Sequence, residues 1–117
     1  MATLQDLPLI TQKTLDECKS LEGYWPLIDI ERIETNHLSE FCDLDRISLD
    51  LIIKAVFLHR QVVARISHRY NEQHYIAANL WVSSGNCTST GDITHRVTIL
   101  YDTVDRTIID AYPGGLP

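Results

Sequence analysis

The sequence predicts a single α+β domain in which helices precede an antiparallel sheet. Apolar residues recur with helical spacing across residues 49–72, and they alternate with polar residues from about position 74 onward. The chain has 117 residues and no Pro/Gly/Ser-rich stretch divides it, so we treat residues 1–117 as one domain. Hydrophobic residues make up 44% and charged residues 22%, which is typical of a folded globular protein.

Helices are expected at the N-terminal end of the chain. Thr14 and Glu17 form a capping-box pattern, which predicts a short helix at about 15–22. Residues 27–34 fit a strand and a helix equally well. Residues 36–44 fit one further helical turn.

The strongest predicted element is one long helix at about 49–72, with Ser48 as its N-cap. Its polar side chains gather on one stripe, and its apolar side chains cover the broad opposite side. Such a wide apolar face suits a helix that packs across a sheet, and it also offers a surface for a homodimer. His59 falls in the middle of this apolar side, where a hydrogen-bonded core histidine is the expected role.

Three antiparallel strands are predicted after the helix, at about 74–83, 95–102 and 106–112. A three-residue turn would pair Asp102 with Arg106. We prefer this register because it gathers the apolar side chains of the last two strands on one face. The residues of that face are Val97, Ile99, Tyr101, Thr107, Ile109 and Ala111.

The opposite face of these two strands is expected to be exposed and polar. The predicted register pairs Thr98 with Asp110, and Arg96 with Tyr112. Arginine, hydroxyl and carboxylate groups side by side can bind phosphate or transfer protons. The alternative role is cross-strand pairing on a solvated face, which stabilises a sheet by roughly a few tenths of a kcal/mol.

Histidines near the ends of the predicted elements are the candidates for acid–base chemistry. Two histidines can share the general acid and base roles that metal-free cleavage of RNA requires. If the protein is a ribonuclease, the catalytic candidates are His95, Arg96, Thr98 and His74. Each histidine alone also suits a surface or hydrogen-bonded role.

The charge of the chain points to a different kind of partner. There are 16 acidic and 10 basic residues, and the net charge of -6 disfavours a duplex-DNA binder. The acidic residues concentrate in residues 1–50, and an acidic surface can capture a basic protein by charge complementarity. The binding candidates are Glu31, Glu34, Glu40, Asp43, Asp110 and Tyr112.

The cysteines and the apolar segments exclude several classes of protein. Cys18, Cys42 and Cys87 are widely spaced, and no local Cys/His spacing suits a metal, so neither a disulfide nor a metal site is expected. No Gly-rich phosphate loop occurs, so no cofactor is expected. Since no apolar run approaches the roughly 18–20 residues that span a bilayer, and no signal-peptide pattern is present, we expect a cytoplasmic protein that does not contact the membrane.

The predicted closing hairpin resembles that of small bacterial ribonuclease toxins. The segments that carry the resemblance are residues 97–102 (Val-Thr-Ile-Leu-Tyr-Asp) and 107–113 (Thr-Ile-Ile-Asp-Ala-Tyr-Pro). The group comprises the barnase/EndoU/colicin/RelE-like domains and the RNase A-like domains of contact-dependent inhibition systems. The resemblance implies metal-independent cleavage of RNA. Asp110 stands where those families place a threonine, and a carboxylate there repels phosphate.

Three hypotheses for the function follow. The first is a small cytosolic interaction protein of a bacterial or phage conflict system, which is immunity- or inhibitor-like and binds a basic partner without being an enzyme. The second is a metal-free ribonuclease toxin or a degenerate relative, and only in that case is RNA the partner. The third is an α+β domain that binds a small ligand between the helix and the sheet.

Overall fold

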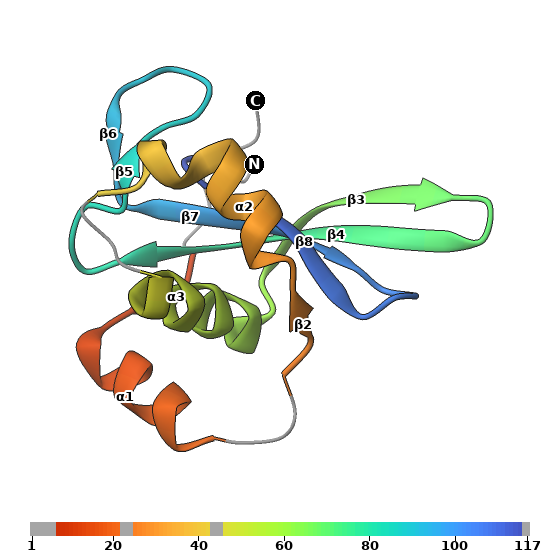
Figure 1. Ribbon diagram of the computed structural model, residues 1–117, viewed down its shortest axis with the longest axis horizontal. Coiled ribbons are helices and arrows are strands. Elements are labelled where there is room, and N and C mark those ends of the chain that lie inside the picture. The colour runs from red at the N-terminus through yellow and green to blue at the C-terminus, as the bar shows by residue number, and fades with distance from the viewer. Residues whose placement is uncertain (1–6, 22–24, 43–45, 116–117) are drawn as a thin grey trace.

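The computed structural model describes residues 7–21, 25–42 and 46–115, which form an α+β domain as predicted (Figure 1). The helices are α1 (Gln12–Ser20), α2 (Ile30–His37) and α3 (Arg46–His59), and a 3₁₀ turn, η1 (Leu38–Glu40), follows α2. The strands are β1 (Leu9–Ile10), β2 (Leu27–Ile28), β3 (Val62–His68), β4 (Asn71–Leu80), β5 (Gly85–Asn86), β6 (Ile93–Thr94), β7 (Arg96–Asp102) and β8 (Thr107–Pro113).

The main sheet is an antiparallel meander of β3, β4, β7 and β8, with short parallel strands at its edges. β1 pairs with β4 and β2 pairs with β8, both in parallel. β1 and β3 share one edge of β4, because β3 pairs with the first part of β4 as far as Ile76 and β1 pairs with Asn79 and Leu80. β5 and β6 form a separate two-stranded sheet. The β3–β4 hairpin extends beyond the helices (Figure 1).

The N-terminal elements begin at polar caps. Thr11, not Thr14, is the N-cap of α1, since the backbone N–H of Thr14 donates to Thr11 Oγ1 at 3.4 Å. The ambiguous segment 27–34 contains a strand and the start of a helix, because Asp29 caps α2 directly after β2. The Asp29 carboxylate accepts from the backbone N–H of Arg32 at 3.3 Å, and this bond fixes where α2 starts.

The predicted helix at 49–72 is wrong in its second half, because α3 ends at His59 and β3 begins at Val62. The β-branched residues Val62, Val63 and Ile66 fit a helical period by chance, but such residues favour a strand. Val62 and Ile66 pair with β4, and Val63 lies at an irregularity between paired residues. His59 is exposed at the end of α3, so it is not the core histidine that the longer helix implied.

The predicted turn between β7 and β8 is wrong by one residue, because Asp102 pairs with Thr107 and not with Arg106. The Asp102 carboxylate accepts from the backbone N–H groups of Val104 and Asp105, at 3.1 and 2.9 Å, and this holds a longer turn. A bulge in β8 then shifts the register. The longer turn sets Ile108 opposite Tyr101 and in the core, fully buried, where Ile109 was predicted, and the bulge at Ile109 then sets Ala111 opposite Ile99.

The shifted register also corrects the predicted polar pairs. Thr98 pairs with Tyr112, and Leu100 pairs with Asp110, so neither Thr98–Asp110 nor Arg96–Tyr112 is a cross-strand pair. This face of the sheet is not exposed, because Thr98 is fully buried and Tyr112 is only 5% exposed.

The two faces of the sheet are covered by different helices. The apolar side of α3 packs on one face, in a core that includes Leu49, Ile52, Ile53, Val56, Ile76, Val97, Ile99 and Ile108. These side chains of α3 lie inside the domain, and a homodimer through this helix stays a prediction. The C-terminal end of α2 lies over the other face, where His37 contacts Asp110 and Tyr112.

Candidate functional site

A groove runs between α3, β2 and the turn that joins β7 to β8. Its central part has a volume of about 650 Å³, and its lining includes Trp25, Leu27, Phe57, Arg60, Tyr101, Asp105 and Arg106. Trp25 and Leu27 also line a neighbouring hollow of about 420 Å³ on one side. Phe57, Arg60 and Tyr101 also line a hollow of about 310 Å³ on the other side, which reaches His74. Because the three cavities share these residues, we treat them as one site and call it the α3 groove.

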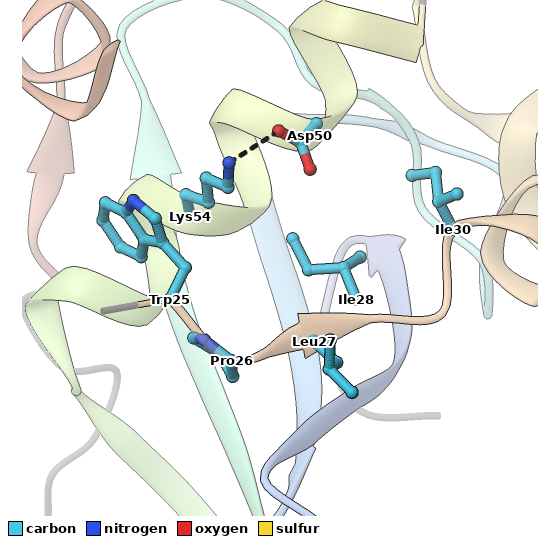
Figure 2. A pocket seen from close by; sticks show the side chains of 7 residues that line it. All are labelled: Trp25, Pro26, Leu27, Ile28, Ile30, Asp50 and Lys54. Atoms are coloured by element: carbon cyan, nitrogen blue, oxygen red, sulfur yellow. Dashed lines mark ion pairs between the residues drawn. The ribbon is translucent and has the colours of Figure 1, made fainter. Parts of the chain in front are cut away.

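The first hollow of the α3 groove combines an apolar wall with an ion pair (Figure 2). Figure 2 shows Trp25 and Ile28 reaching from the β2 segment toward Lys54 and Asp50 of α3. Lys54 Nζ lies 3.0 Å from Asp50 Oδ2 and 5.8 Å from the centroid of the Trp25 ring. Its charge is therefore already neutralised by a neighbour on the same helix.

Two arginines with unusual backbone conformations line the central part of the α3 groove. Arg60 has a φ of 51° and Arg106 a φ of 52°, and they are the two non-glycine residues with positive φ in the described chain. Neither arginine has a carboxylate within ion-pair distance among the described residues. The groove therefore holds two cations without an ion-pair partner among the described residues, and the carboxylate of Asp105 belongs to the same lining.

The chain geometry explains why these two positions adopt the left-handed conformation. Arg60 directly follows α3, and its backbone N–H donates to the carbonyl oxygen of Phe57 at 3.1 Å. Arg106 is the last residue of the turn before β8. Glycine is the usual residue at such positions, since the left-handed conformation costs an L-residue about 1–2 kcal/mol. Arginine at both positions therefore keeps two charges in the groove at the expense of local backbone strain.

Aromatic rings lie beside these cations. Phe57 and Tyr101 pack with ring centroids 5.0 Å apart and planes tilted by 59°. The guanidinium of Arg60 lies 5.2 Å from the centroid of the Phe57 ring. At the far end, His74 Nε2 lies 2.7 Å from Glu72 Oε2, and this hydrogen bond is the main cause that lowers the pKa of Glu72. The α3 groove thus offers planar apolar surfaces next to positive charge.

The four predicted catalytic residues are not gathered at one place. Arg96 and Thr98 are neighbours, with Arg96 Nε donating to Thr98 Oγ1 at 3.4 Å. His95 is exposed, and its Nδ1 lies 3.3 Å from the carbonyl oxygen of Leu80. His74 pairs with Tyr101, five positions along the sheet from the pair that contains Arg96, which corresponds to about 16 Å.

Three of the predicted binding residues contact the same histidine, His37, which the sequence analysis did not select. They are Glu40, Asp110 and Tyr112. His37 Nδ1 lies 2.5 Å from Glu40 Oε1, and His37 Nε2 lies 3.1 Å from Asp110 Oδ1. The ring of His37 packs on that of Tyr112, with centroids 5.5 Å apart. This cluster joins the end of α2 and η1 to β8. The signal available in the sequence was the spacing of His37 and Glu40, which suits one helical turn.

The remaining predicted binding residues differ in their surroundings. Glu31 is exposed in the first turn of α2, and Glu34 is partly buried on the same helix. Asp43 lies outside the described residues. In the described parts of the chain, no three His, Cys, Asp or Glu side chains are placed to hold a metal ion, and no helix is long and apolar enough to cross a membrane.

The residues of the α3 groove were also missed at the level of sequence. Trp25, Arg60 and Arg106 are far apart in the chain and belong to no motif. The predicted helix at 49–72 places Arg60 in its interior, where the left-handed conformation is not compatible with the helix. Arg106 was predicted as the first residue of a strand, directly after the turn, so the sequence analysis gave no signal for its left-handed conformation. Comparison with protein-family models, with curated proteins and with solved structures finds no match for this chain.

Proposed function

We propose that this protein is a small-ligand-binding domain whose α3 groove takes an anion that carries a planar ring. The observation that carries the proposal is the placement of Arg60 and Arg106, both left-handed and both without a carboxylate partner among the described residues, at one cavity. A guanidinium binds carboxylate, phosphate or sulfonate oxygens through two parallel hydrogen bonds. Residues with a strained backbone cluster at functional sites, and ligand binding accounts for the strain at these two positions.

The aromatic lining defines the second half of the ligand. Trp25, Phe57 and Tyr101 present apolar rings to the same cavity as the two arginines. An inorganic anion would leave the ring surfaces that line the cavity uncovered, and a purely apolar ligand would leave the two arginines without an anionic partner. The central volume of about 650 Å³ lies within the range of about 300–1,000 Å³ that is typical of small-molecule sites.

The lining supports binding more than catalysis. None of the described residues that line the α3 groove is a serine, threonine or cysteine. Its one histidine, His74, is bonded to Glu72 at 2.7 Å. The side chains that remain for a ligand are mainly cations and rings, with the carboxylate of Asp105 beside them, and this set suits recognition of a ligand.

Fluorescence titration tests the proposal. Trp25 and Trp81 are the two tryptophans of the chain, so in a Trp81→Phe background the emission comes from Trp25 in the α3 groove. The probe is anilinonaphthalene sulfonate, which joins an anionic group to planar rings, and phenylnaphthylamine is its neutral counterpart. We expect saturable quenching of Trp25 and at least about tenfold tighter binding of the sulfonate, because the neutral probe lacks the charge-assisted hydrogen bonds.

Two double variants provide the matched controls. Arg60→Gly with Arg106→Gly should weaken binding of the sulfonate about tenfold or more. Arg65→Gln with Arg69→Gln changes the net charge equally at exposed positions outside the α3 groove, and it should leave binding unchanged. Equal affinity for both probes, or equal effects of both double variants, would contradict the proposal.

A second proposal retains the protein-interaction hypothesis, in which the chain is an immunity- or inhibitor-like partner of a basic protein in a bacterial or phage conflict system. The net charge of -6 and the exposed Glu31 on α2 support it. Expression without any partner gene separates it from the ribonuclease alternative. An inhibitor leaves growth unchanged, whereas a ribonuclease arrests growth and loses that effect with His95→Ala.

A further inference from the structure

We propose that the ligand of the α3 groove is a nucleoside monophosphate, whose phosphate binds the two left-handed arginines and whose base stacks on Trp25. This inference names the ligand class of the same site, and so it rests on the proposed function. Its support is the order of chemical groups along the groove. Cations and a carboxylate line the central part, an aromatic ring lies at the boundary, and a donor and an acceptor lie side by side in the first hollow.

The central part of the groove holds a carboxylate beside the cations. Asp105 lines the same cavity as Arg60 and Arg106, yet its carboxylate forms neither an ion pair nor a hydrogen bond with these two arginines. The backbone of Asp105 is held on both sides, because its N–H donates to Asp102 Oδ1 at 2.9 Å and its carbonyl oxygen accepts from Thr107 Oγ1 at 3.1 Å. The exposed Asp105 carboxylate is therefore an acceptor for a ligand, next to donors for an anion.

A ligand that suits both kinds of group carries a hydroxyl beside its anion. An anion alone is attracted by the arginines and repelled by Asp105. A hydroxyl group donates to the carboxylate and offsets this repulsion, while the two guanidinium groups balance the negative charge of a phosphate monoester. A sugar phosphate has this combination of groups.

The ring of Trp25 lies where the base of such a ligand would stack. Its Nε1 donates to the carbonyl oxygen of Leu21 at 3.2 Å, which fixes how the ring is oriented. The ring lines both the central part of the groove and the first hollow. Figure 2 shows it beside Lys54, with Ile28 reaching toward α3 next to it. A planar group that stacks on Trp25 within this hollow therefore has the polar groups of α3 within reach of its edge.

These polar groups of α3 are a donor and an acceptor side by side. Lys54 Nζ lies 3.0 Å from Asp50 Oδ2, and both side chains are partly exposed to the hollow. Their ion pair leaves further ammonium hydrogens and the second carboxylate oxygen available to a ligand. An unsubstituted aromatic ring has neither donors nor acceptors on its edge, whereas a nucleobase has both. Guanine fits best, because its N–H donors lie beside a carbonyl oxygen.

The length of the site calls for a spacer between the ring and the anion. Lys54 and Arg60 are six positions apart, and Arg60 directly follows α3. Six residues of helix correspond to a rise of about 9 Å. A spacer lets one ligand contact both groups, and the ribose of a nucleotide is a spacer that also carries hydroxyl groups for Asp105.

Titration of the Trp81→Phe protein with guanosine monophosphate tests the inference. We expect saturable quenching of Trp25 emission, because the base covers this ring. Guanosine lacks the phosphate and ribose phosphate lacks the base, and both are measured by competition. Each should bind at least about tenfold more weakly than guanosine monophosphate, because each loses one end of the site.

The dideoxy analogue of guanosine monophosphate tests the role of Asp105, because it lacks both ribose hydroxyl groups. The protein should prefer the ribonucleotide over this analogue about tenfold, since a hydrogen bond to a charged acceptor is lost. In Asp105→Ala the preference should fall to about twofold or less, because the acceptor is gone for both ligands. The ratio of the two affinities cancels the effect that the lost negative charge has on phosphate binding.

Asp50→Ala tests the placement of the base. It should weaken guanosine monophosphate about tenfold and ribose phosphate by much less, because ribose phosphate has no base to contact Asp50. Glu31→Ala removes an exposed carboxylate of α2 outside the groove, and it should leave both affinities unchanged. Denaturation midpoints check that both variants fold.

The outcomes separate this inference from the proposed function on which it rests. Arginine-dependent binding of anilinonaphthalene sulfonate without binding of guanosine monophosphate would overturn the nucleotide and leave the proposed function standing. Absence of binding by both ligands would overturn both proposals. Equal affinities for the ribonucleotide and its dideoxy analogue, or an Asp50→Ala protein that binds guanosine monophosphate as tightly as before, would also overturn the inference.

Discussion

Leu27 and Arg106 are joined by a backbone hydrogen bond, in which the N–H of Leu27 donates to the carbonyl oxygen of Arg106 at 3.1 Å. The bond ties the strand segment that carries Trp25 to the turn that carries a left-handed arginine. Both belong to the wall of the α3 groove. The width of the groove therefore depends on the register of β2 against β8, which pairs Leu27 with Thr107 and Ile28 with Ile108.

The left-handed arginines predict a conflict between stability and binding. Arg60→Gly and Arg106→Gly should each stabilise the fold by about 0.5–1 kcal/mol, because relief of left-handed strain exceeds the entropy that glycine adds to the unfolded chain. Arg65→Gly, within β3, should instead destabilise by about 0.5–1 kcal/mol. Urea denaturation of the three variants measures these changes. A loss of stability in both groove variants would show that the arginines are not strained.

Much of the sheet was predictable from the sequence, because the alternation of apolar and polar residues in a strand can be seen within a short segment of the chain. β4, β7 and β8 alternate apolar and polar residues clearly enough to be located within a few positions. β3 was missed because Val62, Val63 and Ile66 satisfy the helical and the strand period alike. Pairing with β4 decides between them, and that contact is not visible in the local sequence.

The candidate sites were less predictable, because each depends on contacts between distant elements. The polar face of β7 and β8 was expected to be exposed, but His37 of α2 bonds to Asp110 and covers it. Arg60 lies in the groove because α3 ends at His59, and Arg106 lies there because the turn between β7 and β8 is one residue longer than predicted. The apolar pattern of the sequence determined neither position. Isolated residues of this kind carry no motif, so only their geometry brings them together.

The core position of Ile99 predicts a large penalty for its truncation. Ile99 is fully buried, whereas Val63 on β3 is only partly buried. Ile99→Ala should cost about 2–5 kcal/mol through lost burial and an unfilled cavity, and Val63→Ala should cost about 1 kcal/mol or less. Chemical denaturation midpoints of the two variants decide this. Similar penalties would mean that β3 belongs to the core as much as β7 does.

The contact between His37 and Asp110 should stabilise the docking of α2 on the sheet. His37→Ala leaves the partly buried Asp110 carboxylate with the backbone N–H of Ala111 as its remaining hydrogen-bond donor among the described residues, and the loss of the His37 contact should cost about 1–3 kcal/mol of unfolding free energy. A double-mutant cycle with Asp110→Ala measures the coupling, which we expect to exceed about 0.5 kcal/mol. Additive effects of the two substitutions would show that the contact contributes nothing of its own.

Asp102 predicts a dependence of stability on pH with a definite sign. Its carboxylate accepts from the backbone N–H of Asp105 and Val104 and from the side chains of Asn71 and Gln73, at 2.7 to 3.2 Å. These bonds, the one from Asp105 first, lower the pKa of Asp102 below its ordinary value of 3.8.

A carboxyl group with a lowered pKa in the folded state stabilises the fold above its unfolded pKa, and this contribution is lost as the pH falls through the folded pKa. Asp102→Asn should therefore lower the stability at pH 7, and the difference from the unchanged protein should shrink as the pH falls below about 4. Urea midpoints measured from pH 7 down to pH 3 for both proteins provide the measurement. A difference that stays constant over this range would mean that the turn is held by hydrogen bonds that do not require the charge of Asp102.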